Sequence, residues 1–235
     1  MATNVAARAH STPPPREVPP LREERWHDHL VPALRTTAVT LVLTGLLYPL
    51  VMTGISQALF HEAAEGSFVA DAGGKVVGSA LMAQGFSGAA YFQPRPSAAG
   101  EKGYDPLASG GSNFGATSKK LQDRAVADLD RLKKENPDAP GAVPVELLTA
   151  SASGLDPHLS PAAALWQAPR VSRARGVSID RIQAIVEEYT EGRQLGILGQ
   201  PRVNALELNL AMDRRFGVPG TSTQAVPSPP AGGGK

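Results

Sequence analysis

The sequence predicts an α+β protein with one N-terminal transmembrane helix and a single extracytoplasmic domain of mixed helices and strands. Residues 36–60 carry no formal charge, and arginines gather just before them. Beyond them, short apolar runs alternate with amphipathic segments, as in one packed α+β core. The expected parts are a disordered cytoplasmic tail (1–33), a transmembrane helix (34–60), a soluble domain (61–216) and a second disordered tail (217–235).

Composition narrows the possible chemistry. The 235 residues include no cysteine, which excludes disulfides, thiolate catalysis and thiolate-bound metals. The 23 basic and 22 acidic side chains nearly balance, so the chain has no general attraction to nucleic acid. The 24 glycines and 21 prolines favour many loops.

The charge-free stretch Thr36–Phe60 is long enough to cross a bilayer. Its 25 residues span about 37 Å as a helix, against about 30 Å of hydrocarbon. Gly45 and Pro49 would weaken a soluble helix but are tolerated in a membrane. Because they are four residues apart, they share a face, and with Thr44 and Tyr48 they form a candidate contact with a neighbouring helix. The alternative is a helix that lipid surrounds on all sides.

Positive charge predicts the orientation. Residues 16–35 contain four arginines, whereas residues 61–80 contain only Lys75. This bias places the N-terminus in the cytoplasm and the domain outside. A cleaved signal peptide is the competing interpretation, but its apolar region is usually about 7–15 residues long. We therefore favour an uncleaved anchor.

The first half of the domain contains three predicted elements. Residues 75–84 predict a strand, and a long loop rich in glycine, proline and serine follows over 85–117. A helix then begins after Thr117 or Ser118, because apolar residues recur on one face as far as Asn136-Pro137. Residues 143–150 form a short apolar run that predicts a buried strand.

The second half predicts three helices. Ser160 precedes a short helix over 161–167 with proline at its first position. Residues 178–191 form an amphipathic helix. The run 203–216 alternates like a strand in part, but Asn204 followed by a glutamate three residues later is a capping-box arrangement, so a helix is predicted.

Two constellations could carry chemistry. Gly110 and Gly115 have the spacing of a phosphate-binding P-loop, but alanine stands where that loop needs lysine, so a turn is favoured. His158 could form a hydrolase triad with Ser151 or Ser153, but no G-x-S-x-G elbow occurs, and a turn begun by Asp156 explains the segment better.

Other ionisable groups fit no known site. No metal-binding spacing of histidines and acids appears. Arg170, Arg173 and Arg175 form a basic cluster that could contact a partner or lipid headgroups, although a solvated helix end is the favoured interpretation.

Several ordered motifs together resemble one family, the C subunit of the Kdp-type potassium-transporting ATPase. The resemblance covers about residues 34–216. The motifs are YFQPRPS (91–97) with YDP (104–106), ASGGSNFG (108–115), LTASASGLDPH (148–158) with Ser160-Pro161, RVSRARG (170–176), and LGQPRVN (198–204) with LELNLA (206–211).

The resemblance implies a non-catalytic accessory subunit of a four-subunit inner-membrane potassium uptake complex. Its partners would be a potassium-translocating subunit, a P-type ATPase subunit and a small membrane subunit. The resemblance also implies a role in assembly, described as that of a catalytic chaperone that raises the ATPase subunit's affinity for ATP. ATP and magnesium would belong to the ATPase subunit, potassium would be the transported ion, and no cofactor, metal or catalytic residue is assigned to this chain.

The predicted topology conflicts with direct nucleotide contact, because an external domain cannot reach cytoplasmic ATP. Any effect on ATP affinity would then be allosteric. Two alternatives stay open: a tethered external hydrolase built on Ser153 and His158, and a stand-alone module that binds cell-wall or surface ligands. The candidate partner-binding residues are those of the span face and of two loops: Thr44, Gly45, Tyr48, Pro49, Gly110, Gly111, Ser112, Asn113, Ser151, Ser153, Gly154 and Asp156.

Overall fold

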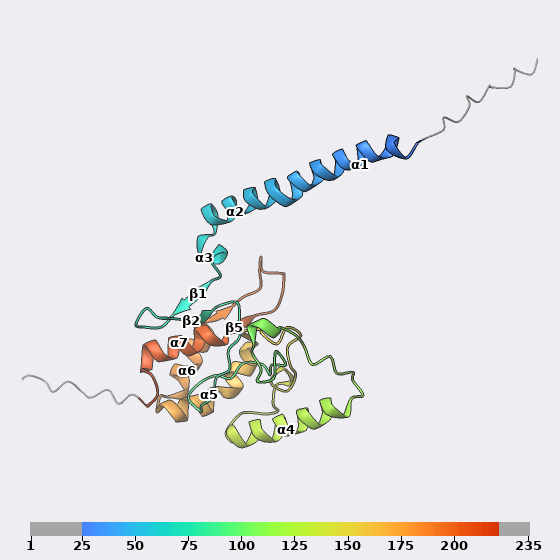
Figure 1. Cartoon of the computed structure of the whole chain (residues 1–235). Helices are drawn as coiled ribbons and strands as arrows, with labels where there is room; N and C mark the ends of the chain where they lie inside the picture. The colour runs from blue at the N-terminus through green and yellow to red at the C-terminus, as the bar shows by residue number, and fades with distance from the viewer. Residues whose placement is uncertain (1–24, 221–235) are drawn as a thin grey trace, which may run out of the picture. The chain divides into compact units, whose positions relative to one another are not determined.

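The computed structural model describes residues 25–220, so most of each predicted tail lies outside the described residues. The chain divides into two units, one ending at Ile55 and the other beginning at Ser56. Each unit is described by itself (Figure 1).

A continuous helix from Trp26 to Leu59 forms the N-terminal part, built from α1 (Trp26–Thr40), a π-helical segment η1 (Leu41–Leu47) and α2 (Tyr48–Leu59). Within residues 25–220 it is the single helix long and apolar enough to cross a membrane. The three segments contain no buried residue. The predicted long apolar helix is thus confirmed.

Helical structure begins earlier than the charge-free stretch, inside the range predicted as a disordered tail. The backbone N–H of Arg25 donates to Asp28 Oδ2 at 3.1 Å, and the Asp28 N–H donates to the Arg25 carbonyl at 2.8 Å. These bonds occupy donors and acceptors that a helix start leaves free. Polar residues can therefore precede the apolar stretch within one helix.

The π-helical segment ends at Leu47, two residues before Pro49. Its closing bond runs from the Tyr48 N–H to the Leu43 carbonyl, five residues back. Pro49 has no N–H and cannot bond the Gly45 carbonyl as an α-helix requires. The wider turn coincides with this interruption, and π-turns occur frequently at functional sites.

The second unit opens with a short helix and a hairpin. Helix α3 (His61–Ala64) leads to β1 (Phe68–Ala70), which pairs antiparallel with β2 (Val76–Ser79). The predicted strand over 75–84 therefore shrinks to four residues. It ends at Ser79, whose hydroxyl donates to the Gly66 carbonyl at 2.7 Å and accepts the Leu81 N–H, which turns the chain.

Three helices and a small sheet form the centre of the domain. They are α5 (Pro161–Arg175), α6 (Ile179–Glu188), α7 (Ala205–Phe216), and the antiparallel strands β3 (His158–Leu159), β5 (Arg202–Asn204) and β4 (Thr190–Glu191), in that spatial order. Figure 1 shows the three helices gathered beneath the short strands.

Helix α5 contributes to both hydrophobic clusters of the domain, which explains why it is longer than predicted. Ala164, Ala168 and Val171 pack with α6 and α7, whereas Ala163 and Trp166 pack with Leu132, Leu147, Leu159 and Ala205. The Ser160 hydroxyl accepts the Ala163 N–H at 3.1 Å, so the predicted N-cap is confirmed. Gly176, with φ 65°, ends the helix.

Two further predicted helices are confirmed. Helix α4 (Lys119–Glu135) begins after Ser118 and ends at Asn136. Helix α7 begins after Asn204, whose side-chain oxygen accepts the N–H groups of Leu206 and Glu207 at 3.1 and 3.3 Å. The start of α7 thus has the side-chain cap that was predicted, whereas Ser118 makes no side-chain capping bond at the start of α4.

The predicted strand over 143–150 is wrong. The segment contains a short 3₁₀ helix, η3 (Val145–Leu147), in which only Leu147 is buried. Glu146 accepts the Ser160 N–H at 3.1 Å and also bonds the Ser160 hydroxyl, so it is held against the start of α5. A strand would direct the Glu146 and Leu147 side chains to opposite faces.

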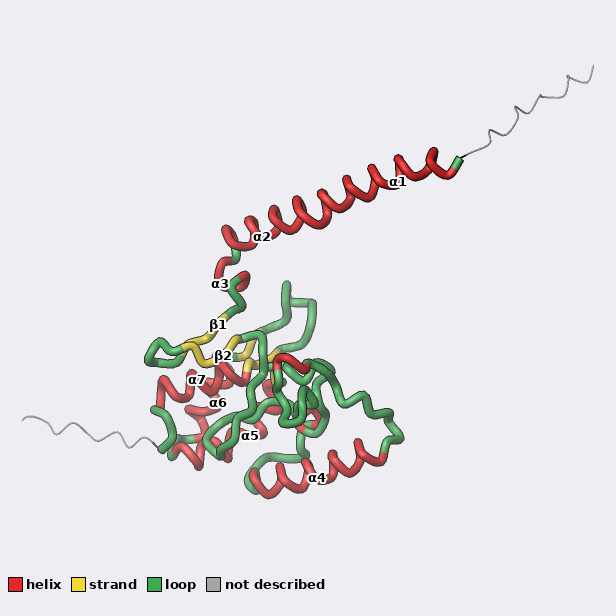
Figure 2. Tube along the Cα trace, viewed as in Figure 1, coloured by secondary structure: helices red, strands yellow, loops and turns green. Residues whose placement is uncertain are grey.

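The long loop 85–117 contains one short 3₁₀ helix, η2 (Pro106–Ala108), and is otherwise irregular. Figure 2, in which loops are green, shows how much of the domain is loop rather than helix or strand. The order of this long loop comes from hydrogen bonds to distant residues. Phe92, which is fully buried, exchanges backbone bonds with the Asn209 side chain at 2.8 and 2.9 Å.

Candidate partner-binding site

The two loops predicted to bind partners lie against each other. The Gly110 N–H donates to the Ser153 carbonyl at 2.8 Å, and the Ser109 hydroxyl donates to the same carbonyl at 3.0 Å. We refer to residues 109–113 and 151–156 as the paired loops. No pattern in the sequence indicates that these loops, about 40 residues apart, would meet.

Glycine permits the close approach. Gly154 has φ 69°, and a Cβ there would lie 2.7 Å from Ala99 Cβ and 2.8 Å from the Gly110 carbonyl oxygen. A Cβ on Gly111 would lie 2.9 Å from the Ala152 carbonyl oxygen. Any larger residue would force these backbones apart.

Ser97, which lies outside the paired loops, makes hydrogen bonds that hold them in place. Its hydroxyl donates to the Gly154 carbonyl at 2.6 Å and accepts the N–H groups of Ala99 and Tyr104 at 3.1 and 2.8 Å. The Ser151 N–H also donates to the Pro96 carbonyl at 3.2 Å. These bonds hold the paired loops at Gly154 and Ser151, so this part of their backbone has a defined shape without a partner.

Asp156, the last residue of the paired loops, makes an ion pair and hydrogen bonds. Its carboxylate pairs with Arg95 at 3.1 Å and accepts the His158 N–H at 3.0 Å and His158 Nδ1 at 3.3 Å. The hydrogen bond from the His158 side chain is the main cause that lowers the pKa of Asp156, and Arg95 adds to it, while burial opposes both.

The geometry does not form a catalytic triad. Among the described residues, no hydrogen bond joins His158 to a serine hydroxyl. Ser151 Oγ and Ser153 Oγ lie 3.5 Å apart, and Ser153 Oγ accepts the Leu155 N–H. A serine nucleophile needs a base within hydrogen-bond reach, which neither serine has here.

The glycine-rich segment does not adopt a phosphate-binding arrangement. No strand immediately precedes residues 110–115, and a separate turn over 115–118 divides them from α4. A P-loop instead runs directly from a strand into a helix, so that backbone N–H groups converge on the phosphates. Ser112 is half-buried, and the exposed Asn113 has φ 51°, a conformation that asparagine tolerates.

The four residues of the predicted contact face of the span are exposed. Thr44 Oγ1 donates to the Thr40 carbonyl at 2.7 Å, which hides its polarity inside the helix. A Cβ on Gly45 would meet only Leu41 of its own helix, and Tyr48 is exposed. The face is therefore small and apolar where Gly45 lies, as close helix packing requires.

The interpretation of the basic cluster as a solvated helix end is wrong for two of its three members. Arg170 and Arg175 are inserted under the loop 88–91, where they donate to backbone carbonyls. Arg175 also pairs with Asp213 at 2.8 Å. Only Arg173, which pairs with Asp138, is exposed. Sequence alone does not show which arginines tertiary structure will bury.

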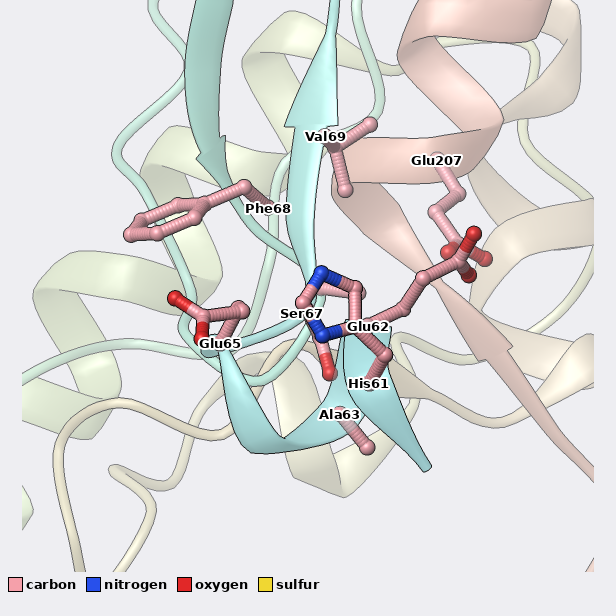
Figure 3. Close-up of a pocket in the computed structure, with 9 residues that line it drawn as sticks. His61, Glu62, Ala63, Glu65, Ser67, Phe68, Val69 and Glu207 are labelled. Atoms are coloured by element: carbon pink, nitrogen blue, oxygen red, sulfur yellow. The ribbon is translucent and has the colours of Figure 1, made fainter. Parts of the chain in front are cut away.

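The structure also reveals an acidic pocket that the sequence did not predict. About 520 Å³ in volume, it lies among α3, β1 and the start of α7, and Glu62, Glu65 and Glu207 line it. Figure 3 shows Glu62 and Glu207 extending toward each other from α3 and α7. Carboxylates disfavour the phosphates of a nucleotide in this pocket.

Within residues 25–220, one helix long and apolar enough to cross a membrane precedes a domain of mixed helices and short strands, which is consistent with a single-pass membrane-anchored protein. The family model for KdpC, the c chain of K⁺-transporting ATPases, matches residues 30–214. This match covers most of the chain, which therefore belongs to the KdpC family.

Three curated relatives agree, each named potassium-transporting ATPase KdpC subunit. The protein of Myxococcus xanthus is 62% identical over 83% of this chain and 94% of its own length. That of Rhodospirillum rubrum is 54% identical over 80% and 96%, and that of Koribacter versatilis is 47% identical over 86% and 98%. The resemblance read from the motifs is confirmed.

Proposed function

We propose that this chain is a non-catalytic accessory subunit that supports assembly and coupling of an ATP-driven potassium uptake complex. The observation that carries the proposal is the helix Trp26–Leu59, which is long and apolar enough to cross a membrane. Membership of the KdpC family supports assembly with other ATPase subunits, because relatives of this chain are named as subunits of a potassium-transporting ATPase. ATP hydrolysis is assigned to a partner subunit, since the chain contains no D-K-T-G-like phosphorylation motif.

Within the complex, the N-terminus is cytoplasmic and the domain extracytoplasmic. The arginine bias before the span supports this orientation. Partners are the potassium-translocating subunit, the P-type ATPase subunit and a small membrane subunit. Any rise in ATP affinity is transmitted through the membrane, because the domain and the nucleotide lie on opposite sides.

Docking uses two rigid features. The span offers the face of Thr44, Gly45, Tyr48 and Pro49, and the domain offers the paired loops. Pre-formed surfaces lose little conformational entropy on binding, which favours a stable contact.

Orientation can be tested with single cysteines, since the native chain has none. A membrane-impermeant maleimide applied to intact spheroplasts should label Ala72→Cys, in the exposed turn after β1, and should spare Ser11→Cys. Lysed cells, in which both should react, provide the control. Labelling of Ser11→Cys alone would reverse the topology.

Docking through the span can be tested with a matched pair of variants. Gly45→Leu should reduce recovery of partner subunits with a tagged chain at least about tenfold, because leucine prevents close helix packing. Gly54→Leu is the control, since Gly54 lies in the same long helix but outside the proposed face, and no atom stands within 4 Å of a Cβ added there. Equal recovery of both variants would show that the Gly45 face is not an interface.

A further inference from the structure

The loop between β4 and β5 projects an apolar tip from the domain. Leu195, Ile197 and Leu198 are 88%, 75% and 54% exposed. In Figure 1 this loop appears as the orange-brown excursion that rises from the short strands. Residues 194–198 are called the hairpin tip below.

The hairpin tip has a defined shape. Gln194 and Leu198 exchange two backbone hydrogen bonds, both 2.9 Å long. Leu195 has φ 53°, a left-handed conformation that is costly for a residue with a side chain, and Gly196 follows with φ 76°. A strained, bonded turn that exposes aliphatic side chains is pre-organised for a specific contact rather than left as a loose loop.

Polar side chains surround the base of the tip. Arg193 donates to Gln200 Oε1 at 2.9 Å, and Arg202 pairs with Glu191 at 2.8 Å. An apolar centre with a polar rim is the usual composition of a protein interface.

The size of the tip restricts the kind of partner. Three aliphatic side chains cannot supply the roughly 800 Å² per partner that a stable, free-standing complex usually buries. A second copy of this chain, or a freely diffusing protein, would therefore not be held by the tip alone. It suits a surface to which the chain is already anchored.

The backbone of the tip argues against insertion into lipid. Among the described residues, the carbonyls of Leu195, Gly196 and Ile197 accept no hydrogen bond. Irregular backbone with unpaired carbonyls is not tolerated in hydrocarbon, where no donor is present. The tip also lacks the aromatic residues that are typical of membrane interfaces.

We propose that the hairpin tip inserts into an apolar recess on another subunit of the ATPase complex, one that offers hydrogen-bond donors to these carbonyls. This inference rests on the proposed function, because it requires that the chain assemble with those subunits. The tip is then a third docking element, distinct from the span face and the paired loops.

The test uses the tagged full-length chain co-expressed with the other subunits. The double variant Leu195→Asn/Ile197→Ser removes the apolar side chains, and asparagine tolerates the left-handed turn. Recovery of partner subunits across a detergent series should fall at least about tenfold. Val126→Ser, which changes a 57% exposed valine on α4, should leave recovery unchanged.

A photo-crosslinking amino acid at position 197 identifies the occupant. Adducts with another subunit, absent when the same group stands at position 126, would support the proposal. Wild-type recovery by the double variant, or adducts with lipid alone, would overturn it. If even the wild-type chain recovers no partner subunit, the proposed function itself is wrong. That outcome differs from failure of the tip proposal, in which the wild type and the double variant recover partners equally.

Discussion

Replacement of Arg170 by alanine should destabilise the domain strongly. The guanidinium makes five hydrogen bonds: to the carbonyls of Gly88, Ala89 and Tyr91 at 3.2, 2.7 and 3.0 Å, and to the Asn136 and Gln167 side chains at 2.8 Å each. The residue is 3% exposed, and burial lowers the pKa of its guanidinium. It therefore links the long loop, the end of α4 and α5.

The expected loss of unfolding free energy in Arg170→Ala follows from the buried acceptors that would lose their hydrogen-bond donor. A hydrogen bond to a charged group contributes about 1.5–3 kcal/mol, and an unsatisfied buried acceptor costs about 1–3 kcal/mol. Because the five bonds share one side chain, their contributions do not add. The expected loss is about 3–5 kcal/mol, a large share of a typical stability of about 5–15 kcal/mol.

Equilibrium urea unfolding of the detergent-solubilised full-length chain measures this loss. The chain has two tryptophans, and Trp166 is buried on α5 whereas Trp26 is exposed. In a Trp26→Phe background, fluorescence therefore reports the unfolding of the domain core. Arg173→Ala is the matched control, because an exposed ion pair contributes at most about 1 kcal/mol.

The reasoning would be refuted if the Arg170 and Arg173 variants lost equal stability, or if Arg170→Ala cost less than about 1 kcal/mol. Arg170→Lys should recover only part of the loss, since one ammonium cannot reach the separate acceptors that a guanidinium bridges.

Two more predictions concern the paired loops. Gly154→Ala should lower the free energy of unfolding by about 3 kcal/mol or more, because a Cβ there would meet neighbouring atoms. Gly141→Ala is the control: its φ is 68°, but no atom lies near a new Cβ, so it should lower the free energy of unfolding by only about 1 kcal/mol. Thermal melts that show equal losses for the two variants would contradict the close packing at Gly154. Because the pKa of Asp156 is lowered below its ordinary 3.8, its contribution to stability should be complete above that value and disappear as pH falls through the folded-state pKa. The free energy of unfolding, measured from pH 6 to pH 2.5, should fall with acid in the wild type and fall less in Asp156→Asn. Identical pH profiles for the two proteins would show that the Asp156 carboxylate does not contribute to stability.

Local signals in the sequence determined the parts whose physics is local. The absence of charge over 36–60 was enough to predict a membrane-length helix, because transfer of charged groups into hydrocarbon is costly. The starts of α5 and α7 followed from Ser160 and Asn204, since a cap interacts only with the next turn. The ordered motifs likewise indicate the family, and the family model that matches residues 30–214 confirms it.

Tertiary structure decided everything that depends on residues far apart in the chain. The run 143–150 became a 3₁₀ turn because Glu146 is held by Ser160. Arg170 became a buried link rather than a solvated residue because carbonyls from a distant loop surround it, and no periodicity records such acceptors. The meeting of Gly110 with Ser153 likewise needs the folded backbone, since only close approach of two chain segments creates that contact.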